Sequence, residues 1–211
     1  MLYAFGFERV GVVLGDLYFV DPKPSKGQEG AEHGVRLELR VLDRGALKGT
    51  IYSATPIDVG RPIWRVDLLE SVDGKPGSLD RVHHHPVFRD WDPTNRVFER
   101  ELSADPLGWL AGKLADLDGV LADADFPADT AGPADAADLR AAAPEIVDAA
   151  RRLLAKVRDG ELGTAPAGTK SGTEPGAESV TEPGTEPVSV AAGEASGSGE
   201  AEPVLARAGW L

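Results

Sequence analysis

Three consecutive histidines, His83, His84 and His85, are the residues in this sequence best suited to chemistry. Successive side chains of a β-strand point to opposite faces, so His83 and His85 would share one face and His84 the other. Two imidazoles placed in this way can both reach one divalent ion. The strand expected to pair with them supplies the carboxylate of Asp67. His83 and His85 are therefore candidate metal ligands.

The same region offers the groups that acid–base chemistry requires. Arg65 and Arg81 could hold a phosphate as charged forks. One neutral histidine could take the proton of a 2′-hydroxyl while another donates a proton to the leaving oxygen. On this interpretation the chain is an RNA-cleaving or phosphoester-processing enzyme. Its candidate catalytic residues are His83, His85, Arg65, Arg81 and Asp67.

A third interpretation assigns no ligand to the histidines. Histidines at the end of a strand are commonly rim residues that bind backbone carbonyls. The nearby aromatic residues are expected in the core under a helix, where aromatic side chains bury a large apolar area; they are Trp64, Phe88, Trp91 and Phe98. Asp90 and Asp92 flank a proline and are expected to form turns.

Short motifs in this region resemble those of two known families. Gly77, five further residues and then His83-x-His85 resemble the opening of the first cupin motif, which implies a metal-binding β-barrel. The chain departs from that motif afterwards, since no histidine follows His85. An aromatic-Arg-x-Asp strand, residues 64–67, followed by residues 83–86 (HHHP) is similar to the TumE-type toxins of bacterial toxin–antitoxin pairs. That resemblance implies an RNA-directed activity.

Hydrophobic periodicity predicts the strands that must position these residues. Runs at 3–14 and 17–20 favour an opening hairpin with its turn at Gly15-Asp16, and residues 21–34 read as a surface loop with a solvated His33. Strict alternation at 35–42 predicts a strand with its apolar residues on one face and its charged residues on the other. Further strands are expected at 49–54, 62–70 and 79–85, the last two as a hairpin.

Two helices are expected after the strands. Asp105-Pro106 is a helix start, and leucines at spacings of three and four from Leu107 to Leu121 predict one amphipathic helix. Residues 122–143 read as a loop or a weak helix. A second helix is expected to begin at Pro144 and to end at Gly160. The predicted fold class is α+β: an antiparallel sheet or small open barrel over about 1–100, covered by one or two C-terminal helices.

Composition limits the partners. The formal net charge is −13, of which residues 161–211 contribute eight glutamates against Lys170 and Arg207. An acidic field repels nucleic-acid phosphates, so nucleic acid is not the expected partner, although a local basic cleft would leave RNA open. The absence of cysteine excludes a thiol nucleophile and favours a reducing compartment. No membrane span or signal segment is recognisable, and a cytoplasmic location is expected.

The end of the chain reads differently from its beginning. Residues 1–160 are expected to form one α+β domain, and residues 161–211 a disordered acidic tail built from Thr-Glu-Pro-Gly units that have no apolar face. The last residues, 204–211, are apolar again and could dock on a protein partner. The segments 91–93 and 105–110 resemble uncharacterised actinobacterial domains, a resemblance that implies no activity.

These observations lead to one main hypothesis and two alternatives. The main hypothesis is a non-enzymatic cytoplasmic binding or protein-interaction module, with the sheet face or the 204–211 end as its contact surface. The alternatives are the histidine-dependent enzyme and a metal-binding, cupin-like barrel. No organic cofactor is expected. A bound divalent metal ion is compatible with the sequence. The sequence predicts no oligomeric state.

Overall fold

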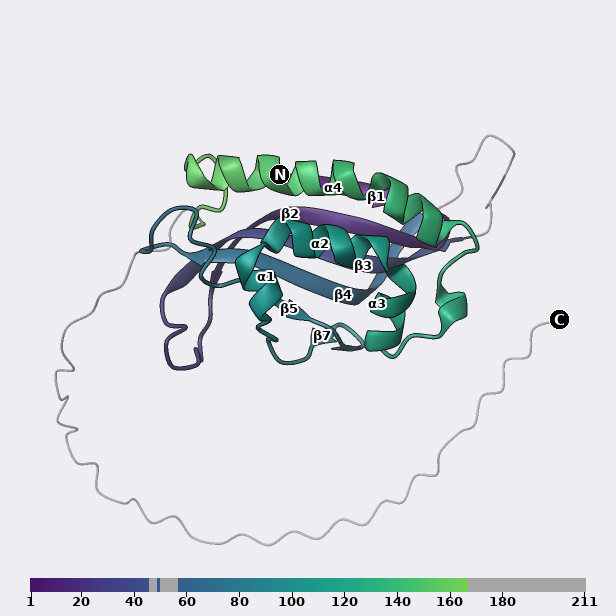
Figure 1. The fold of residues 1–211 in the computed structure, drawn as a ribbon, viewed down its shortest axis with the longest axis horizontal. Helices are drawn as coiled ribbons and strands as arrows, with labels where there is room; N and C mark the ends of the chain where they lie inside the picture. Colours follow the sequence, from purple (N-terminus) through teal and green to yellow (C-terminus); the bar gives the residue numbers. More distant parts are fainter. Residues whose placement is uncertain (46–48, 50–56, 167–211) are drawn as a thin grey trace, which may run out of the picture. The chain divides into compact units, whose positions relative to one another are not determined.

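A five-stranded antiparallel sheet is the centre of the fold. The computed structural model describes residues 1–45, 49 and 57–166. Within them the sheet has the order β1-β2-β3-β4-β5, with strands at Leu2–Gly6, Val10–Val20, Ala31–Arg44, Ile57–Ser71 and His83–His85. A separate two-stranded ribbon joins β6 (Phe88–Arg89) to β7 (Asp92–Pro93). The sheet is open, and with the helices that follow it confirms the predicted α+β fold (Figure 1).

The two faces of the sheet differ in chemistry. Val35, Leu37 and Leu39 of β3 are buried, and they pair across the strands with Leu68, Val66 and Trp64 of β4. Because side chains alternate along a strand, the intervening residues lie on the opposite side. We call that side the polar face; on the three strands β3, β4 and β5 it carries Arg36, Glu38, Arg40, Arg65, Asp67, His83 and His85.

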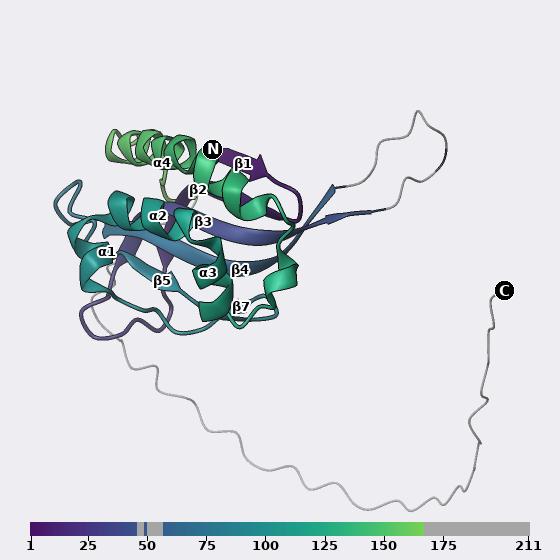
Figure 2. The same ribbon diagram turned by 45° about the vertical axis from the view of Figure 1, so that its right-hand side comes forward.

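The helices lie on the apolar side of the sheet. They are α1 (Arg100–Ala104), α2 (Pro106–Ala115), α3 (Leu117–Asp123) and α4 (Asp135–Arg158), with a 3₁₀ turn, η1, at Ala128–Thr130. Figures 1 and 2 show α4 running along β2 and β3 with α2 beside it. The buried leucines of α2 and α4, among them Leu110, Leu114 and Leu153, join the strand residues in one core. None of the helices in the described part of the chain packs on the polar face.

Both helix predictions were right in kind and wrong in extent. The leucine-rich helix breaks at Asp116, whose side chain accepts a hydrogen bond from the Gly119 amide and caps α3. A second cap therefore divides the expected single helix. The last helix begins at Asp135, nine residues before Pro144, which lies inside it. The alanines that precede this proline have the highest helix propensity, which explains why the helix starts earlier than the proline suggests.

The opening hairpin forms, but its turn lies elsewhere. Gly15 is inside β2, where it pairs with Leu2 of β1 and with Arg36 of β3. The chain turns at residues 7–9 instead, closed by a hydrogen bond from the Phe7 amide to the Val10 carbonyl. Asp135, far along the chain, accepts hydrogen bonds from the backbone amides at both Glu8 and Arg9. A long-range carboxylate thus decides where the hairpin turns.

The structure also changes the bounds of other predicted strands and loops. The predicted loop at 21–34 ends early, because β3 already begins at Ala31 and includes His33. The predicted strand at 79–85 shrinks to His83–His85. The predicted strand at 49–54 lies, apart from Gly49, outside the described residues, as does the predicted tail beyond residue 166 with its apolar end. Among the described helices, none combines the length and the hydropathy that a membrane-spanning helix needs.

Candidate functional site

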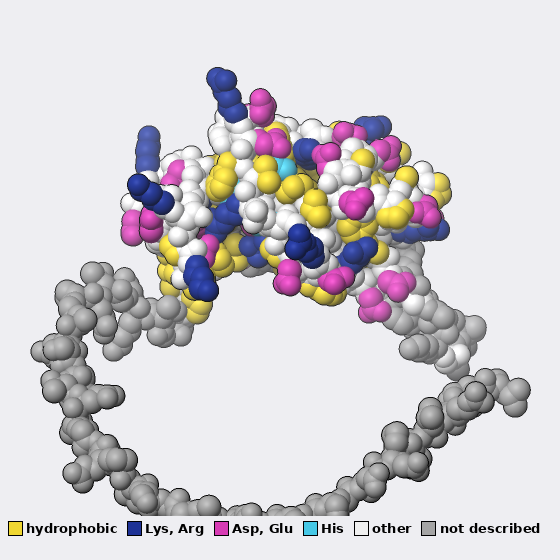
Figure 3. Space-filling view, turned by 90° about the horizontal axis from the view of Figure 1, so that it is seen from below, with side chains coloured by type: hydrophobic (Ala, Val, Ile, Leu, Met, Phe, Trp, Pro, Cys, Tyr) yellow, Lys and Arg dark blue, Asp and Glu magenta, His cyan; other side chains and the backbone are white. Residues whose placement is uncertain are grey.

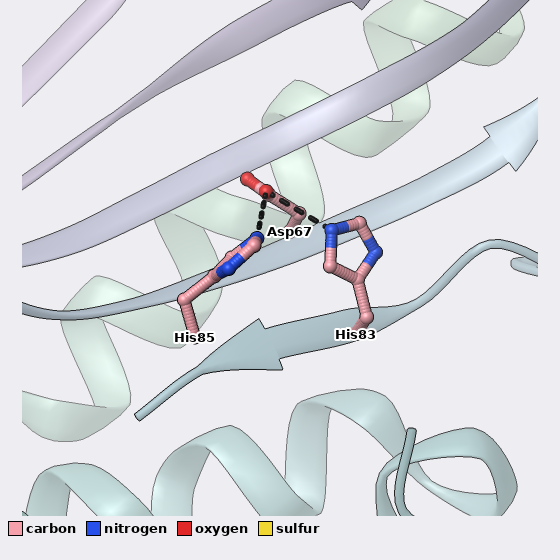
Figure 4. A group of neighbouring side chains, drawn as sticks. All are labelled: Asp67, His83 and His85. Carbon is pink, nitrogen blue, oxygen red and sulfur yellow. Dashed lines mark ion pairs between the residues drawn. The ribbon is translucent and has the colours of Figure 1, made fainter. Parts of the chain in front are cut away.

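The pairing of β4 with β5 brings the candidate residues together. Asp67 is the cross-strand partner of His83, and Arg65 is the partner of His85. All four side chains therefore lie on the polar face. Figure 4 shows both imidazoles projecting from β5 toward the Asp67 carboxylate on β4. The relative exposure is 1% for Asp67, 1% for His83 and 5% for His85, so the cluster is shielded from solvent.

Backbone carbonyls determine the tautomer of both histidines. The Nδ1 atom of His83 lies 2.8 Å from the Arg81 carbonyl oxygen, and Nδ1 of His85 lies 2.6 Å from the Thr94 carbonyl oxygen. A carbonyl oxygen can only accept a hydrogen bond, so each Nδ1 must carry the hydrogen. In the neutral ring the Nε2 atom is then a lone-pair donor. The carbonyl contacts agree with the interpretation of these histidines as rim residues. Their burial does not, because rim residues are expected to be exposed to solvent.

Both Nε2 atoms face the same carboxylate oxygen. The distance to Asp67 Oδ2 is 3.3 Å from His83 Nε2 and 3.7 Å from His85 Nε2, the contacts drawn as dashed lines in Figure 4. These three potential ligand atoms all lie within 4.8 Å of one another. Two imidazole nitrogens and one carboxylate oxygen thus converge on a single point.

Two arginines hold the Asp67 carboxylate in place. Arg36 binds it as a fork, with Nε 2.7 Å from Oδ1 and Nη2 3.2 Å from Oδ2. The Nε atom of Arg65 lies 3.4 Å from Oδ2. Burial opposes ionisation of Asp67, but the contact with the His83 ring and the charge and hydrogen bonds of Arg36 outweigh it and hold the pKa of Asp67 well below its usual range. Asp67 is therefore an ionised carboxylate at neutral pH.

Arg65 is an unusually buried cation. Its Nη1 atom lies 3.7 Å from Glu38 Oε1, and its guanidinium lies over the Phe88 ring at 5.5 Å from the ring centroid. Burial lowers the pKa of Arg65, opposed by the charge of Asp67. The Arg65 Nε atom is buried without a hydrogen-bond partner among the described residues. Burial and the nearby Arg65 charge together lower the pKa of His85 to about 4, so this ring is neutral at pH 7.

A cavity of about 290 Å³ opens beside this cluster. The two histidines, Asp67, Arg36 and Arg65 border it, and its remaining lining residues are Phe19, Asp21, Leu69, Pro93 and Arg96. A second cavity of about 350 Å³ shares His85, Asp21 and Arg96 with the first. On the side of the molecule seen in Figure 3, only a small area of histidine reaches the surface. The two buried histidine rings thus border a partly open cavity.

The middle histidine belongs to the helix side. His84 Nδ1 lies 3.4 Å from the indole Nε1 of Trp64, and His84 Nε2 lies 3.0 Å from Glu99 Oε1. The other oxygen of Glu99 accepts a hydrogen bond of 2.9 Å from Trp109 Nε1. Burial lowers the pKa of His84, although Glu99 opposes this shift. This network connects β5 to the helices and leaves the neighbouring histidines directed at the polar face.

Arg81 is the predicted site residue that does not join the cluster. It donates a hydrogen bond to the Gly27 carbonyl and lies 3.4 Å from Asp80 Oδ2, and it is absent from the lining of the cavity. Arg81 precedes β5, in a turn that does not continue the alternation. Arg36, which the sequence interpretation missed, binds Asp67 and lines the cavity. Its place on the polar face was predictable from alternation, but its register against Asp67 was not.

Of the four aromatic residues predicted in the core, two are buried and two are exposed. Trp64 and Phe88 are buried as expected, with 2% and 7% exposure. Trp91 and Phe98 are 60% and 52% exposed, contrary to the prediction of core positions. Both lie between β5 and α1. Asp90 has a positive φ of 56°, which agrees with its expected place in a turn.

No protein-family model matches this chain, and neither do any of the curated proteins or solved structures with which it was compared. The resemblances to the cupins, the TumE-type toxins and actinobacterial domains therefore stay predictions.

Proposed function

We propose that this protein binds a divalent metal ion through His83 Nε2, His85 Nε2 and Asp67 Oδ2. One observation carries the proposal: two histidines direct their lone-pair nitrogens at one carboxylate oxygen while their Nδ1–H groups bind backbone carbonyls. Histidines that coordinate metals nearly always donate their other N–H in this way, because it sets the tautomer and the ring orientation. Two histidines and a carboxylate are a common ligand set for divalent transition metals.

The distances agree with this assignment. Metal–nitrogen and metal–oxygen bonds of about 2.0–2.2 Å in a tetrahedral site separate neighbouring ligand atoms by roughly 3.4 Å. The two nitrogen-to-oxygen distances of 3.3 and 3.7 Å are close to that separation. The three ligand atoms lie within 4.8 Å of one another, so they would move closer together around a tetrahedral ion. Arg36 would act as an outer partner, since its fork on Asp67 orients the carboxylate without occupying every lone pair.

A cation also removes an electrostatic conflict. When both rings are neutral, two nitrogen lone pairs face an ionised carboxylate in a buried setting, which is unfavourable. A proton on His83 would satisfy one of these contacts, because it lies at 3.3 Å, but it would leave the His85 contact unsatisfied. A single divalent ion at the point of convergence serves all three atoms.

The chemistry available at such a centre follows from its ligand count. Three protein ligands leave at least one coordination position for water or a small ligand, and the adjoining cavity of about 290 Å³ is where that ligand would lie. The proposal is compatible with the main sequence hypothesis of a binding module. It gives less support to metal-free cleavage of RNA, because Arg81, one of the two arginines assigned to the phosphate, has its contacts outside the cavity.

The test is metal binding by the full chain after treatment with a chelator. Titration calorimetry with Zn²⁺ and Co²⁺ should give one ion per chain, and Co²⁺ should show a ligand-field spectrum of nitrogen and oxygen ligands. His85→Gln and His83→Gln should each weaken binding at least tenfold. His33→Gln is the matched control, because it is the fourth histidine of the chain and lies against Glu70 rather than Asp67. It should bind metal as the wild type does.

Two results would contradict the proposal. One is the absence of stoichiometric binding by the wild type. The other is unchanged affinity in both glutamine variants when their circular dichroism spectra match that of the wild type.

A further inference from the structure

We infer that the cavity beside the metal centre receives the phosphate group of a small organic phosphate, held between the ion and the guanidinium of Arg65. The inference rests on the proposed metal centre and names the ligand class of that same site. Three observations support it: the charge balance of the polar face, the unmatched Arg65 donor and the size and lining of the cavity.

The charges in and around the cavity balance before a metal is counted. Four guanidinium groups meet four carboxylates through ion pairs of 2.7–3.7 Å. The groups are those of Arg36, Arg40, Arg65 and Arg96, and of Asp21, Glu32, Glu38 and Asp67. A divalent ion adds two positive charges in a shielded place, where an uncompensated charge is costly. An anionic ligand that accompanies the metal restores the balance.

Arg65 is the group that can bind this anion. Its guanidinium is buried and borders the cavity, and its Nε has no hydrogen-bond partner among the described residues. The same Nε lies 3.4 Å from Asp67 Oδ2, which places the guanidinium next to the proposed ion. Contacts with Glu38 and the Phe88 ring hold the side chain in that orientation. A planar guanidinium fork matches two oxygens of a phosphate group.

The size of the cavity restricts the rest of the ligand. About 290 Å³ is at the lower end of the range for small-molecule sites, of roughly 300–1,000 Å³. Phe19, Leu69 and Pro93 add apolar side chains to the lining beside the charged groups, which suits a short organic substituent. The net charge of −13 opposes the approach of a polyanion. These properties favour a small phosphomonoester over an RNA strand.

The experiment uses the full chain, loaded with Zn²⁺ or left metal-free, and titrates it with inorganic phosphate and with phenyl phosphate. Both probes should bind the metal-loaded chain, and binding to the metal-free chain should be at least tenfold weaker. In chains shown to be fully loaded with Zn²⁺, Arg65→Gln should lower the affinity for phosphate at least tenfold; the zinc content of each variant is measured before the phosphate titration. Arg65→Lys keeps the positive charge but lacks the guanidinium fork. Its affinity for phosphate should lie between those of the wild type and Arg65→Gln.

The matched control is Arg81→Gln, because Arg81 is a neighbouring arginine outside the cavity. It should bind phosphate as the wild type does. Phosphate binding that persists in Arg65→Gln, or that is absent from a chain shown to hold Zn²⁺, would overturn the inference and leave the metal centre standing. Equal binding of acetate would overturn the phosphate assignment, and displacement of phenyl phosphate by an equimolar RNA oligonucleotide would overturn the small-ligand assignment. Failure of the chain to bind Zn²⁺ would instead refute the proposed function.

Discussion

His84 Nε2 and Glu99 Oε1 lie 3.0 Å apart on the helix side of the sheet, and this contact joins β5 to the residue that caps α1. Because His84 is held toward the helices, the residues on either side of it must point to the polar face. Glu99 completes the network by accepting a hydrogen bond from Trp109. The candidate site thus depends on a residue that never touches it.

Glu99→Ala should lower the free energy of unfolding by about 1–2 kcal/mol, because it leaves His84 and the Trp109 indole without their common acceptor. Urea denaturation measures this change. Glu101→Ala is the control, since Glu101 is exposed on the adjoining helix and should change stability by less than about 0.5 kcal/mol. Equal stability of both variants would show that the network does not hold β5.

Asp135→Ala should be among the most destabilising single substitutions of this chain. The fully buried carboxylate accepts hydrogen bonds from the backbone amides of Glu8, Arg9 and Gly132 at 2.6, 3.0 and 2.7 Å. Its removal leaves these donors unsatisfied, and a loss of about 3 kcal/mol or more is expected. Thermal unfolding tests this expectation. The control is Asp138→Ala, an exposed residue of the same helix turn, with an expected loss of at most about 1 kcal/mol.

Metal binding should be visible in stability as well as in affinity. A ligand that binds only the folded chain stabilises it by about 2.7 kcal/mol at a free concentration one hundred times its dissociation constant. Zn²⁺ should therefore raise the melting temperature of the wild type. It should not raise that of His85→Gln, which lacks one ligand atom. The chelated forms of both proteins provide the baseline, and an equal rise in both would speak against ligation by His85.

Asp80 should contribute stability that depends on pH. Burial opposes its ionisation, but hydrogen bonds from the Ser71 amide and from the hydroxyls of Ser78 and Ser71, each of 2.9 Å, lower the pKa of Asp80 below its usual 3.8. A carboxylate whose pKa is lower in the folded chain stabilises it above the unfolded pKa and loses that effect as the pH falls. The wild type should thus exceed Asp80→Asn in stability at pH 6, and the difference should shrink below pH 4. A difference that grows on acidification would reverse the assigned sign.

Much of the architecture could be predicted from local periodicity. Alternation at 35–42 identified the apolar residues of β3, and the leucines from Leu107 onward identified the helical region, because burial of one face imposes the period of the element. The same period placed His83 and His85 on one side of their strand. Pairing with the strand that contains Asp67 was also expected, since the turn-rich segment between them suits a hairpin.

The tertiary structure alone decided how these residues are used. Arg36 rather than Arg81 binds beside Asp67, because the register of β3 against β4 depends on the whole sheet. The Thr94 carbonyl that binds His85 Nδ1, and the carboxylate of Asp135 that closes the first turn, come from segments whose positions depend on loop closure and packing. Periodicity states which side of an element a residue occupies. Which groups meet there is determined by contacts between distant parts of the chain, for which a single sequence carries no local signal.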